Sequence, residues 1–371
     1  MKVCHMTSVH DSMDDRIFLR EATAAAEAGY ETYIVAPGKS DIQKGVHIEG
    51  IGNWNVSRLQ RMLLITRKIY RRALEIDADI YQFHDPELLP IAMKLKKKKK
   101  VVFYDSHEDV PRQILAKDWL PFWVRRIISN CFELYEKKIA RRLDCVIAAT
   151  PHIAEIFKNK GAESIVVRNY PLLEDIHGEN GDYEERENII CYAGGLTEQR
   201  GITQLVKVLG NLEAKLELAG DIEKNYLEEL QKLPGFSKVK MLGFLNRAEI
   251  EKLYNRSRIG MAVLKKTPNH INSLAIKLFE YMAAGIPVIC SDFPLWKEII
   301  EGNKCGICVD PEDTKTIVKN IVHLFENDEL AKTMGDNGKK AVKDKYNWNV
   351  EKNNLIKTYK SFDQYYLGDQ L

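Results

Sequence analysis

The stretch that most constrains the fold runs from Asn272 to Ser291 and reads NSLAIKLFEYMAAGIPVICS. We expect a helix that Ser273 caps, because a serine side chain can accept hydrogen bonds from the free N–H groups of the first turn. Gly285 ends this helix and Pro287 prevents its continuation. The apolar residues Val288–Cys290 then indicate a short buried strand.

The expected helix has an apolar side and a polar side. The apolar side is formed by Leu274, Leu278, Phe279 and Met282, and Glu280 lies opposite. A helix N-terminus carries unpaired N–H groups and a partial positive charge, so it suits a phosphate. Glu280, further along the helix, is placed to reach whatever that phosphate is attached to. The alternative is a core helix–strand pair with a solvent-facing glutamate.

Short apolar strands alternate with helices along the whole chain, which predicts parallel sheets covered on both faces. A length of 371 residues fits two domains. We expect an α/β domain over residues 1–172, a polar and acidic linker over 173–187, and a second α/β domain over 188–356. The expected strands are 2–7, 31–36, 46–51, 80–83, 101–104, 145–148 and 165–167, then 189–192, 215–219, 239–242, 260–263, 288–290 and 306–309.

The composition is that of a globular protein, with 45% hydrophobic residues and a net charge of +2. No apolar run approaches the roughly 20 residues that span a bilayer, and the residues from Met1 onward lead into a strand without a signal region. The seven cysteines are scattered, as buried thiols are in a reducing compartment, so a cytoplasmic location is expected. Cys305 and Cys308 have the spacing of a redox or metal half-site, but no second pair accompanies them and a structural role is expected.

Ligands of open parallel sheets bind at the carboxyl ends of the strands. In the first domain His84 follows a strand and is expected at its tip, facing a cleft. Asp85 can cap the helix that Pro86 begins. Other polar side chains near strand ends are candidates for ligand binding, namely Ser8, His10, Asp85, His107 and Glu108.

Two loops after strands of the second domain carry features that suit a nucleotide. Gly194 and Gly195 let the backbone approach a ligand closely, and Arg200 is a fixed cation for a phosphate. Gly243 provides a bend and Phe244 a ring that could hold a planar base. No G-x-G-x-x-G fingerprint occurs, which argues against a nicotinamide or flavin enzyme. The motifs of zinc peptidases, serine hydrolases and P-loop proteins are also absent.

Together these positions resemble the retaining GT-B-fold glycosyltransferases of the family 4 type. The resemblance covers essentially the whole chain and is strongest over 194–201, 242–245 and 271–291 and at the strand-end sequence HDPE of residues 84–87. It implies two Rossmann-like domains that face a cleft, with a nucleotide-sugar donor held mainly by the second. It also implies a C-terminal helix that crosses back, so that residues 357–371 pack on the first domain.

The resemblance further implies roles for individual residues. Its catalytic set is His84, Arg200 and Asn272. Its donor-binding set is Gly194, Gly195, Gly243, Phe244, Ser273, Leu274, Ala275, Lys277 and Glu280. Within that set Glu280 is the second glutamate of the family's E-x7-E element and binds the ribose, while the backbone amides of residues 273–275 meet the diphosphate. The acceptor-side candidates are Ser8, His10, Asp85, His107 and Glu108.

Two residues differ from the family pattern. Asn272 stands where the first glutamate of E-x7-E is usual, and its amide can hydrogen-bond a sugar hydroxyl but cannot stabilise positive charge as a carboxylate can. Gly195 stands where an arginine is usual in the first phosphate loop. Arg200 is then the cation of that loop, and Lys277 is available to compensate.

The reaction implied is transfer of a sugar from a UDP- or GDP-sugar to a lipid-linked or glycan acceptor in surface polysaccharide synthesis. The diphosphate leaves as an oxocarbenium-like sugar forms, and the acceptor hydroxyl attacks from the same face. Positioning and stabilisation of the leaving group supply the catalysis, so neither a metal ion nor another cofactor is expected. Two alternatives are a nucleotide-sugar epimerase, suggested by His84, His107 and Glu108, and a degenerate nucleotide-sugar-binding partner protein, suggested by Asn272 and Gly195.

The first half of the chain is basic. Residues 1–170 contain 28 Lys and Arg against 22 Asp and Glu, and the remainder contains 27 against 31. Lys94–Lys100 is a dense positive run, and residues 58–72 add six basic side chains on an apolar-striped helix. Residues 119–126 combine aromatic rings with arginines, as segments that attach to anionic membranes do. We therefore predict peripheral contact with the cytoplasmic face of the membrane, the alternative being solvated lysines and packed aromatics. Nucleic acid is not expected, since no recognition motif accompanies the charge.

Overall fold

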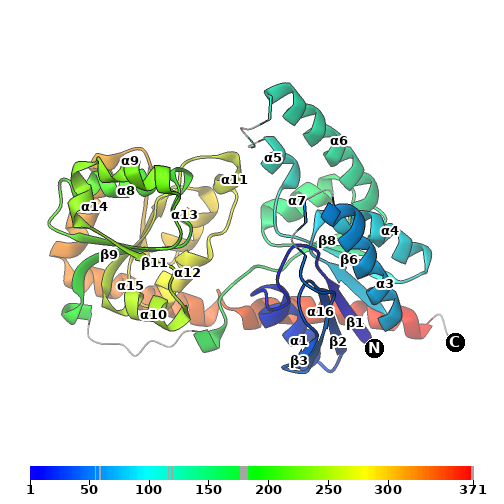
Figure 1. Ribbon diagram of the computed structural model, residues 1–371. Helices are drawn as coiled ribbons and strands as arrows, with labels where there is room; N and C mark the ends of the chain where they lie inside the picture. Colours follow the sequence, from blue (N-terminus) through cyan, green and yellow to red (C-terminus); the bar gives the residue numbers. More distant parts are fainter. Residues whose placement is uncertain (55, 58–59, 116, 118–119, 176–182, 369–371) are drawn as a thin grey trace. The chain divides into compact units, whose positions relative to one another are not determined.

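A computed structural model describes residues 1–54, 56–57, 60–115, 117, 120–175 and 183–368 (Figure 1). Contacts divide the chain into unit 1, Met1–Asn169 with Trp348–Leu371, and unit 2, Tyr170–Asn347. The boundaries expected from the sequence, after 172 and after 356, therefore lie somewhat too far along the chain. Residues 176–182 of the expected linker lie outside the described residues.

Unit 1 is built on an eight-stranded sheet with the order β3-β4-β2-β1-β5-β6-β7-β8. Neighbouring strands are parallel except for β3, which pairs antiparallel with β4. The sequence did not indicate β3, because its three residues are all exposed and show no apolar alternation. The strands are β1 (Lys2–Met6), β2 (Glu31–Ala36), β3 (Asp41–Gln43), β4 (Val46–Gly50), β5 (Ile80–Phe83), β6 (Val101–Ser106), β7 (Cys145–Ala148) and β8 (Ser164–Val166).

Helices cover both faces of this sheet. The apolar side chains of α3, α4, α6 and α7 form one buried cluster with the strands. The other face carries η1, α1 and the C-terminal helix α16, whose Tyr359 stacks on Phe103 of β6. The helices are η1 (Ile17–Ala22), α1 (Thr23–Glu27), η2 (Arg61–Ile65), α3 (Thr66–Ile76), η3 (Pro86–Leu88), α4 (Leu89–Lys97), α5 (Val110–Leu115), α6 (Phe122–Ala140), α7 (Pro151–Asn159) and α16 (Trp348–Gly368).

Helix α5 lies in a stretch for which the sequence indicated no strand, and its own start signals are local. Asp109 accepts a hydrogen bond from the Arg112 N–H, and Pro111 sits in the first turn. A capping aspartate and an early proline are signals for a helix start. With six residues, α5 is too short to show a clear helical periodicity in the sequence.

Unit 2 contains a six-stranded parallel sheet with the order β11-β10-β9-β12-β13-β14. Two apolar clusters, one on each face, form its core. The strands are β9 (Glu187–Ala193), β10 (Lys215–Ala219), β11 (Val239–Gly243), β12 (Ser257–Ala262), β13 (Val288–Ser291) and β14 (Gly306–Val309). The helices are η4 (Leu173–Asp175), η5 (Tyr183–Glu185), η6 (Glu198–Arg200), α8 (Ile202–Leu209), α9 (Lys224–Gln231), η7 (Pro234–Lys238), α10 (Arg247–Arg256), α11 (Pro268–Ile271), α12 (Ile276–Ala283), α13 (Pro294–Ile300), α14 (Thr314–Glu326) and α15 (Asp328–Asp344).

The fold-defining stretch forms the expected helix and strand, α12 and β13, but the cap is different. The Ser273 hydroxyl donates to the His270 carbonyl at 2.9 Å, and Ala275 occupies the N-cap position without a side-chain bond. The serine closes the end of α11 instead of starting α12, so the predicted cap was wrong. Gly285 ends α12 with φ +65°, as expected.

The strand order reverses at one point in each sheet. In unit 1 this point lies between β1 and β5, and in unit 2 between β9 and β12. Open α/β sheets bind ligands outside the carboxyl ends of the strands at such points. The loops after β1 and β5, and those after β9 and β12, are therefore where a site is expected.

The cysteines are free thiols. Cys305 is buried and its thiol donates to the Ile300 carbonyl, whereas Cys308 faces Cys290 of the neighbouring strand at 3.6 Å between sulfurs. The expected structural role of the C-x-x-C spacing therefore agrees with these contacts. Among the described residues, no helix is both long and apolar enough to cross a bilayer.

Candidate active site

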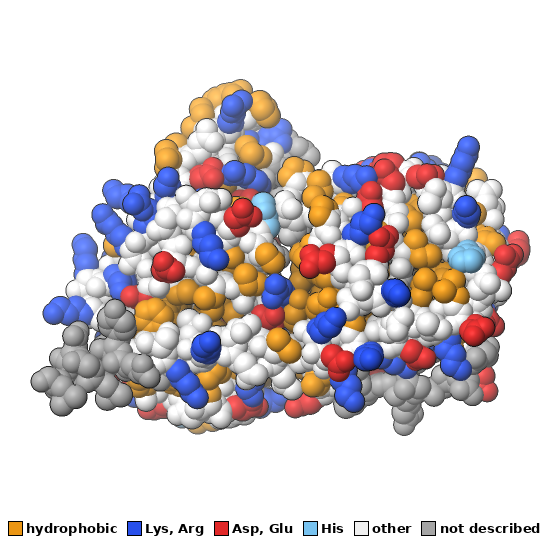
Figure 2. Space-filling view, turned by 180° about the vertical axis from the view of Figure 1, so that it is seen from behind, with side chains coloured by type: hydrophobic (Ala, Val, Ile, Leu, Met, Phe, Trp, Pro, Cys, Tyr) orange, Lys and Arg blue, Asp and Glu red, His pale blue; other side chains and the backbone are white. Residues whose placement is uncertain are grey.

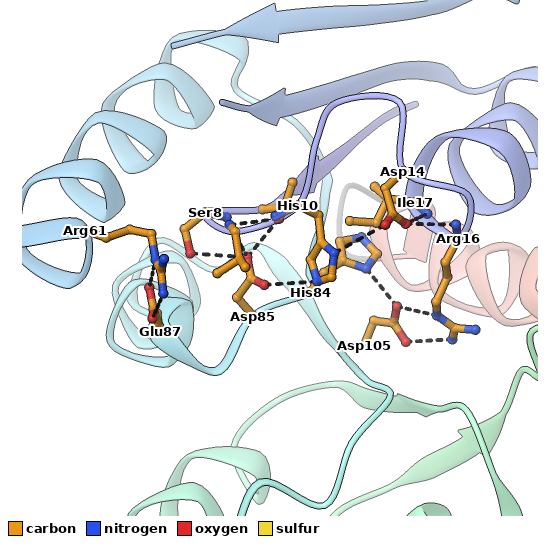
Figure 3. A network of polar contacts seen from close by, with 12 residues as sticks. Ser8, His10, Asp14, Arg16, Ile17, Arg61, His84, Asp85, Glu87 and Asp105 are labelled. Atoms are coloured by element: carbon orange, nitrogen blue, oxygen red, sulfur yellow. Dashed lines mark hydrogen bonds and ion pairs between the residues drawn. The ribbon is translucent and has the colours of Figure 1, made fainter. Parts of the chain in front are cut away.

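A single carboxylate holds the loop after β1 against the end of β5 (Figure 3). The Asp85 Oδ2 atom accepts hydrogen bonds from the Thr7 hydroxyl at 2.9 Å and from the Ser8 N–H at 2.5 Å. Asp85 was expected to cap the helix that follows, but it makes no such bond. Its carboxylate turns instead to the N–H and hydroxyl groups of the neighbouring loop, which leaves both Asp85 and Ser8 buried.

His84 lies inside unit 1. Its side chain is fully buried, with Nδ1 2.7 Å from Asp105 Oδ2 and Nε2 3.1 Å from Nδ1 of His5. Both ring nitrogens are therefore occupied, and the His5 and His84 rings stack at 5.4 Å. His84 therefore does not face outward as expected, but it still borders the cavity at the ends of β5 and β6.

Behind the loops lies a buried ion cluster centred on Arg16 (Figure 3). The Arg16 Nε and Nη2 atoms donate to the two carboxylate oxygens of Asp105 at 2.8 and 2.7 Å. Nη2 also lies 3.1 Å from Glu21. Burial opposes ionisation of Asp105, but the Arg16 charge outweighs it and holds the pKa of that carboxyl well below its usual range. Burial and the Asp105 charge raise the pKa of Glu21 to about 7.

A hydrogen-bond chain connects this cluster to the C-terminal helix. The Gln82 side-chain amide donates to Glu21 at 2.5 Å, and the Tyr359 hydroxyl of α16 donates to the Gln82 oxygen at 2.5 Å. Each member of the chain is buried. Helix α16 is thereby tied to β5 through polar groups and to β6 through the packing of Tyr359 on Phe103.

Three buried side chains, His5, Glu21 and His84, have possible metal-ligand atoms within 4.8 Å of one another. The surroundings do not fit a cation. The Arg16 guanidinium lies beside Glu21 and would repel it, and His84 is already bonded to Asp105. Burial and the neighbouring His84 lower the pKa of His5, so this imidazole is neutral.

A cavity of about 280 Å³ opens at the ends of β5 and β6, beside α5. His10, Asp85, His107 and Glu108 line it, so four of the five acceptor-side candidates surround one space, while Ser8 lies beneath it. The rings of His10 and His107 meet edge to face at 5.4 Å. A hydrogen bond with Asp14 raises the pKa of His10, whereas burial lowers the pKa of His107. The Nδ1 atom of His107 is buried and has no hydrogen-bond partner among the described residues.

An ion pair that the sequence did not indicate stands in the wall of this cavity. The Arg61 Nε and Nη2 atoms donate to the two oxygens of Glu87 at 3.0 and 2.8 Å (Figure 3). The Glu87 side chain is buried. Arg61 was predicted to be one of the basic residues of a membrane-facing helix, because its carboxylate partner Glu87 follows a different strand and is distant in sequence.

In unit 2, the loop after β9 brings two cations together. Gly194 has φ +132°, a conformation that side chains other than glycine rarely adopt. A Cβ atom there would lie 3.2 Å from the Lys277 Nζ and 3.4 Å from the Arg200 Nη1. Lys277 is buried, and its Nζ donates to the Tyr192 hydroxyl at 3.3 Å. No carboxylate among the described residues pairs with either cation, so an anion at Gly194 would meet two positive charges.

The entrance to α12 provides fewer free amides than expected. The Ser273 N–H donates to the His270 carbonyl at 3.0 Å, so it is not available to a diphosphate. The N–H groups of Leu274 and Ala275 have no partner in the described part of the chain. The Ser273 carbonyl accepts from the Trp296 indole at 2.7 Å and is fixed by it. Asn272 is exposed at the end of α11.

Glu280 is half-buried and not a freely solvated glutamate. Its Oε2 atom accepts a hydrogen bond from the Tyr254 hydroxyl of α10 at 2.9 Å. Burial and the Glu280 charge raise the pKa of Tyr254 well above its usual value, so the hydroxyl remains a donor. Sequence analysis did not single out Tyr254, Tyr192 or Trp296, because each lies within a strand or helix and resembles an ordinary core aromatic.

The remaining donor-side candidates lie at the end of β11. Gly243 has φ +67° and open space around it. The Phe244 side chain is 80% exposed. This ring is free to stack on a planar group.

Unit 1 also exposes large apolar side chains next to basic ones. In α6, Phe122, Trp123 and Leu134 are between 65% and 69% exposed. Arg125, Arg126, Lys137 and Lys138 belong to the same helix. Figure 2 shows apolar side chains gathered at the tip of unit 1, with lysines and arginines nearby. Arg58 and Trp119, which were part of the membrane prediction, lie outside the described residues. In the lysine run 94–100, Lys96 forms an ion pair with Asp144 and Lys100 forms one with Asp77.

Comparison with known proteins finds one family in each part of the chain. Residues 16–169 match the family described as Glycosyltransferase Family 4, and residues 175–341 match that described as Glycosyl transferases group 1.

Individual proteins are similar at lower identity. An uncharacterized glycosyltransferase of Methanocaldococcus jannaschii is 31% identical over 183 residues, which are 48% of this chain and 46% of that protein. A phosphatidyl-myo-inositol mannosyltransferase of Mycobacterium leprae is 20% identical over 92% of this chain and 91% of that protein. The Anabaena protein HepE, solved in complex with UDP, has the same fold with a TM-score of 0.75, 16% identity, and coverage of 97% of this chain and 100% of that one.

Proposed function

Because this chain belongs to the glycosyltransferases of the GT-B fold and family 4 type, we propose that it transfers a hexose from a UDP- or GDP-sugar to a lipid-linked saccharide or other glycan with retention of configuration. The observation that carries the proposal is the pair of cations, Lys277 and Arg200, at the Gly194 backbone. A diphosphate is the group that two unpaired cations beside an open glycine loop suit best. That HepE is solved with UDP supports a nucleotide as the donor.

The chemistry follows from where the charges lie. As the bond between sugar and diphosphate breaks, negative charge builds on the leaving oxygen, and Arg200 and Lys277 stabilise it. The free N–H groups of Leu274 and Ala275 add two dipoles of the same sign. Glu280, oriented by Tyr254, binds the ribose hydroxyls, and Phe244 stacks on the base. The step needs positioning and charge stabilisation from these side chains and proceeds without a metal ion.

His84, which was predicted to be catalytic, is buried where it borders the cavity, and on the acceptor side the hydrogen-bonding role belongs to His107. Its imidazole is neutral and lines the cavity, with one nitrogen that lacks a partner among the described residues. It can therefore hydrogen-bond a hydroxyl of the sugar or of the acceptor. Asn272, exposed at the end of α11, offers an amide to the transferred sugar.

The decisive experiment is transfer of a radiolabelled sugar from UDP- and GDP-sugars into a crude glycolipid extract, with and without EDTA. Retention is read from the anomeric coupling of the product by NMR. Arg200→Ala should lower kcat by about 10²–10³, the range for losing one preorganised charge-stabilising group. An Arg200→Ala enzyme with unchanged turnover, or an inverted product, would contradict the proposal. An epimer formed from the donor alone would favour the epimerase alternative.

We also propose peripheral contact with an anionic leaflet through the exposed apolar and basic side chains of α6. The phosphatidyl-myo-inositol mannosyltransferase to which the chain is similar supports a lipid acceptor. The test is sedimentation with anionic and neutral liposomes at low and high salt, using Trp123→Ser as the variant. Equal and negligible binding to both liposomes would end this part of the proposal.

A further inference from the structure

We propose that the cavity at the ends of β5 and β6 binds one neutral sugar ring of the acceptor, and that the Arg61–Glu87 ion pair is the element that selects it. This inference rests on the proposed function, since it names what the acceptor side of a glycosyltransferase receives. Every residue that lines the cavity belongs to unit 1.

The size of the cavity limits the ligand. At about 280 Å³ it lies just below the range of about 300–1,000 Å³ that is usual for pockets of small molecules. One pyranose ring with its hydroxyls is a ligand of that scale. A longer glycan would place only its terminal residue here, with the rest outside.

The charge of the lining argues against an anionic ligand. Arg16 lies against both Asp105 and Glu21, and His10 lies against both Asp14 and Asp85. Among the groups that line the cavity, the carboxylates of Asp85, Glu87, Asp105 and Glu108 outnumber the cations of Arg61 and Lys117, even when His10 is protonated. Negative charge is in excess, so a phosphate or a uronic acid carboxylate entering the cavity would be repelled. The phosphate of a lipid carrier is therefore not the group that enters.

The hydrogen-bonding groups suit a polyol. A hydroxyl both donates and accepts, so it can bind carboxylates, amides and imidazoles alike. Two bonds from Arg61, one to each oxygen, hold the Glu87 carboxylate in one plane and fix the direction in which it can accept hydrogen bonds. Gln113 and the unpartnered Nδ1 of His107 add groups of both kinds. A site that positions hydrogen bonds in this way discriminates strongly between ligands that can and cannot complete them.

The chain contains a matched control for the ion pair. Arg72 of α3 also pairs with a glutamate through Nε and Nη2, at 3.2 and 2.6 Å, although both nitrogens donate to the same Glu49 oxygen and Arg72 also pairs with Glu75. That pair is more exposed, with 43% and 20% of the two side chains accessible, against 28% and 5% for Arg61 and Glu87. Neither Arg72 nor Glu49 lines the cavity.

The test is saturation-transfer NMR on the full-length chain with the methyl glycosides of glucose, galactose, mannose and N-acetylglucosamine. Methyl glucuronide and glucose 6-phosphate are the charged counterparts. We expect at least one neutral glycoside to bind and both charged probes to bind at least about tenfold more weakly. Glu87→Gln should weaken the neutral ligand by about tenfold, because it breaks the paired geometry of one hydrogen-bonding group, and Glu49→Gln should have no effect. Octyl glycosides at submicellar concentration, compared with methyl glycosides, distinguish a glycolipid head group from a free sugar, and either preference supports the proposal.

Three outcomes would overturn it. They are failure of every neutral glycoside to bind, equal or tighter binding of the charged probes, and equal effects of Glu87→Gln and Glu49→Gln. Thermal shifts with UDP-glucose and GDP-mannose, measured on the same samples, report on the proposed donor site. A normal donor shift together with one of these outcomes would reject the sugar cavity while leaving the proposed transferase function intact.

Discussion

Replacing Arg16 with methionine should destabilise unit 1 far more than a typical substitution of an arginine. Arg16 makes two bonds to Asp105, which is fully buried, and one contact to the buried Glu21. Removing one partner of a buried ion pair leaves an uncompensated charge and costs about 3–5 kcal/mol. Methionine fills part of the space of the arginine stem, so most of the loss comes from the charge and not from a cavity.

The control is Arg72→Met. This arginine is 43% exposed and pairs with Glu49 at the surface, where ion pairs contribute about 0–1 kcal/mol. The two substitutions remove the same charge from the same unit, so net-charge effects cancel between them. Native-state hydrogen exchange of the β5 and β6 amides measures the opening free energy of unit 1 without assuming that the two units unfold together.

The pH dependence provides a second check. Arg16 depresses the pKa of Asp105, so the stabilisation from ionised Asp105 is present above its unfolded pKa near 4 and is lost as the pH falls through the lower folded pKa. In Arg16→Met the buried carboxyl can be protonated, so the deficit relative to wild type should be largest at pH 7 and shrink toward pH 4. A cost for Arg16→Met equal to that of Arg72→Met, or a deficit independent of pH, would refute the assigned role of the cluster.

Tyr254→Phe removes the hydrogen-bond donor to Glu280 and should raise the KM for a nucleotide sugar about tenfold, with a smaller change in kcat. The reason is that a hydrogen bond to a charged group contributes about 1.5–3 kcal/mol. An equal increase in KM for a 2′,3′-dideoxy donor would contradict the link between Glu280 and the ribose. A hydrogen bond with Asp14 raises the pKa of His10, so the stabilisation that protonated His10 contributes is complete below about pH 6.5 and is lost as the pH rises through the folded pKa. His10→Asn should therefore lower Tm more at pH 5.5 than at pH 8.5. An equal loss of Tm at both pH values would refute the ion pair. Gly201→Ala places a Cβ 1.7 Å from the Val263 carbonyl oxygen at φ +78° and should lower the free energy of unfolding by more than about 2 kcal/mol. Gly243→Ala has open space around the new Cβ and should lower it by only about 1 kcal/mol, as measured by denaturant titration.

Much of the fold could be predicted from local pattern alone. Strands β2 and β5 begin and end where the apolar runs 31–36 and 80–83 do, because a central parallel strand is buried on both faces and its hydrophobic run is bounded by polar loops. The antiparallel edge strand β3 could not be found this way, since its residues are exposed and its pairing depends only on backbone hydrogen bonds to β4.

Local competition explains why the start of α12 was misplaced. Serine bonds equally well to the N–H groups ahead of it, as a cap, and to a carbonyl behind it. The short helix α11 places the His270 carbonyl within reach of Ser273, and that bond forms instead. A propensity scale has no information about which of the two partners is nearer.

Two of the three candidate histidines of unit 1, His84 and His107, show what sequence cannot supply. Both follow strands and both precede an acidic residue, His84 before Asp85 and His107 before Glu108. The parallel register pairs Phe83 with Tyr104, so His84 comes level with Asp105 and the two side chains meet at 2.7 Å inside the unit.

Strand β6 continues through Ser106, one residue beyond that bonded pair, and His107 therefore emerges past the buried layer and lines the cavity. The position of each histidine depends on the register between β5 and β6, two strands that are about 20 residues apart in sequence. Apolar periodicity within one strand does not specify that register. Both histidines could be placed near the cavity from the sequence, but only the register shows that His84 joins the ion cluster while His107 does not pair with Asp105.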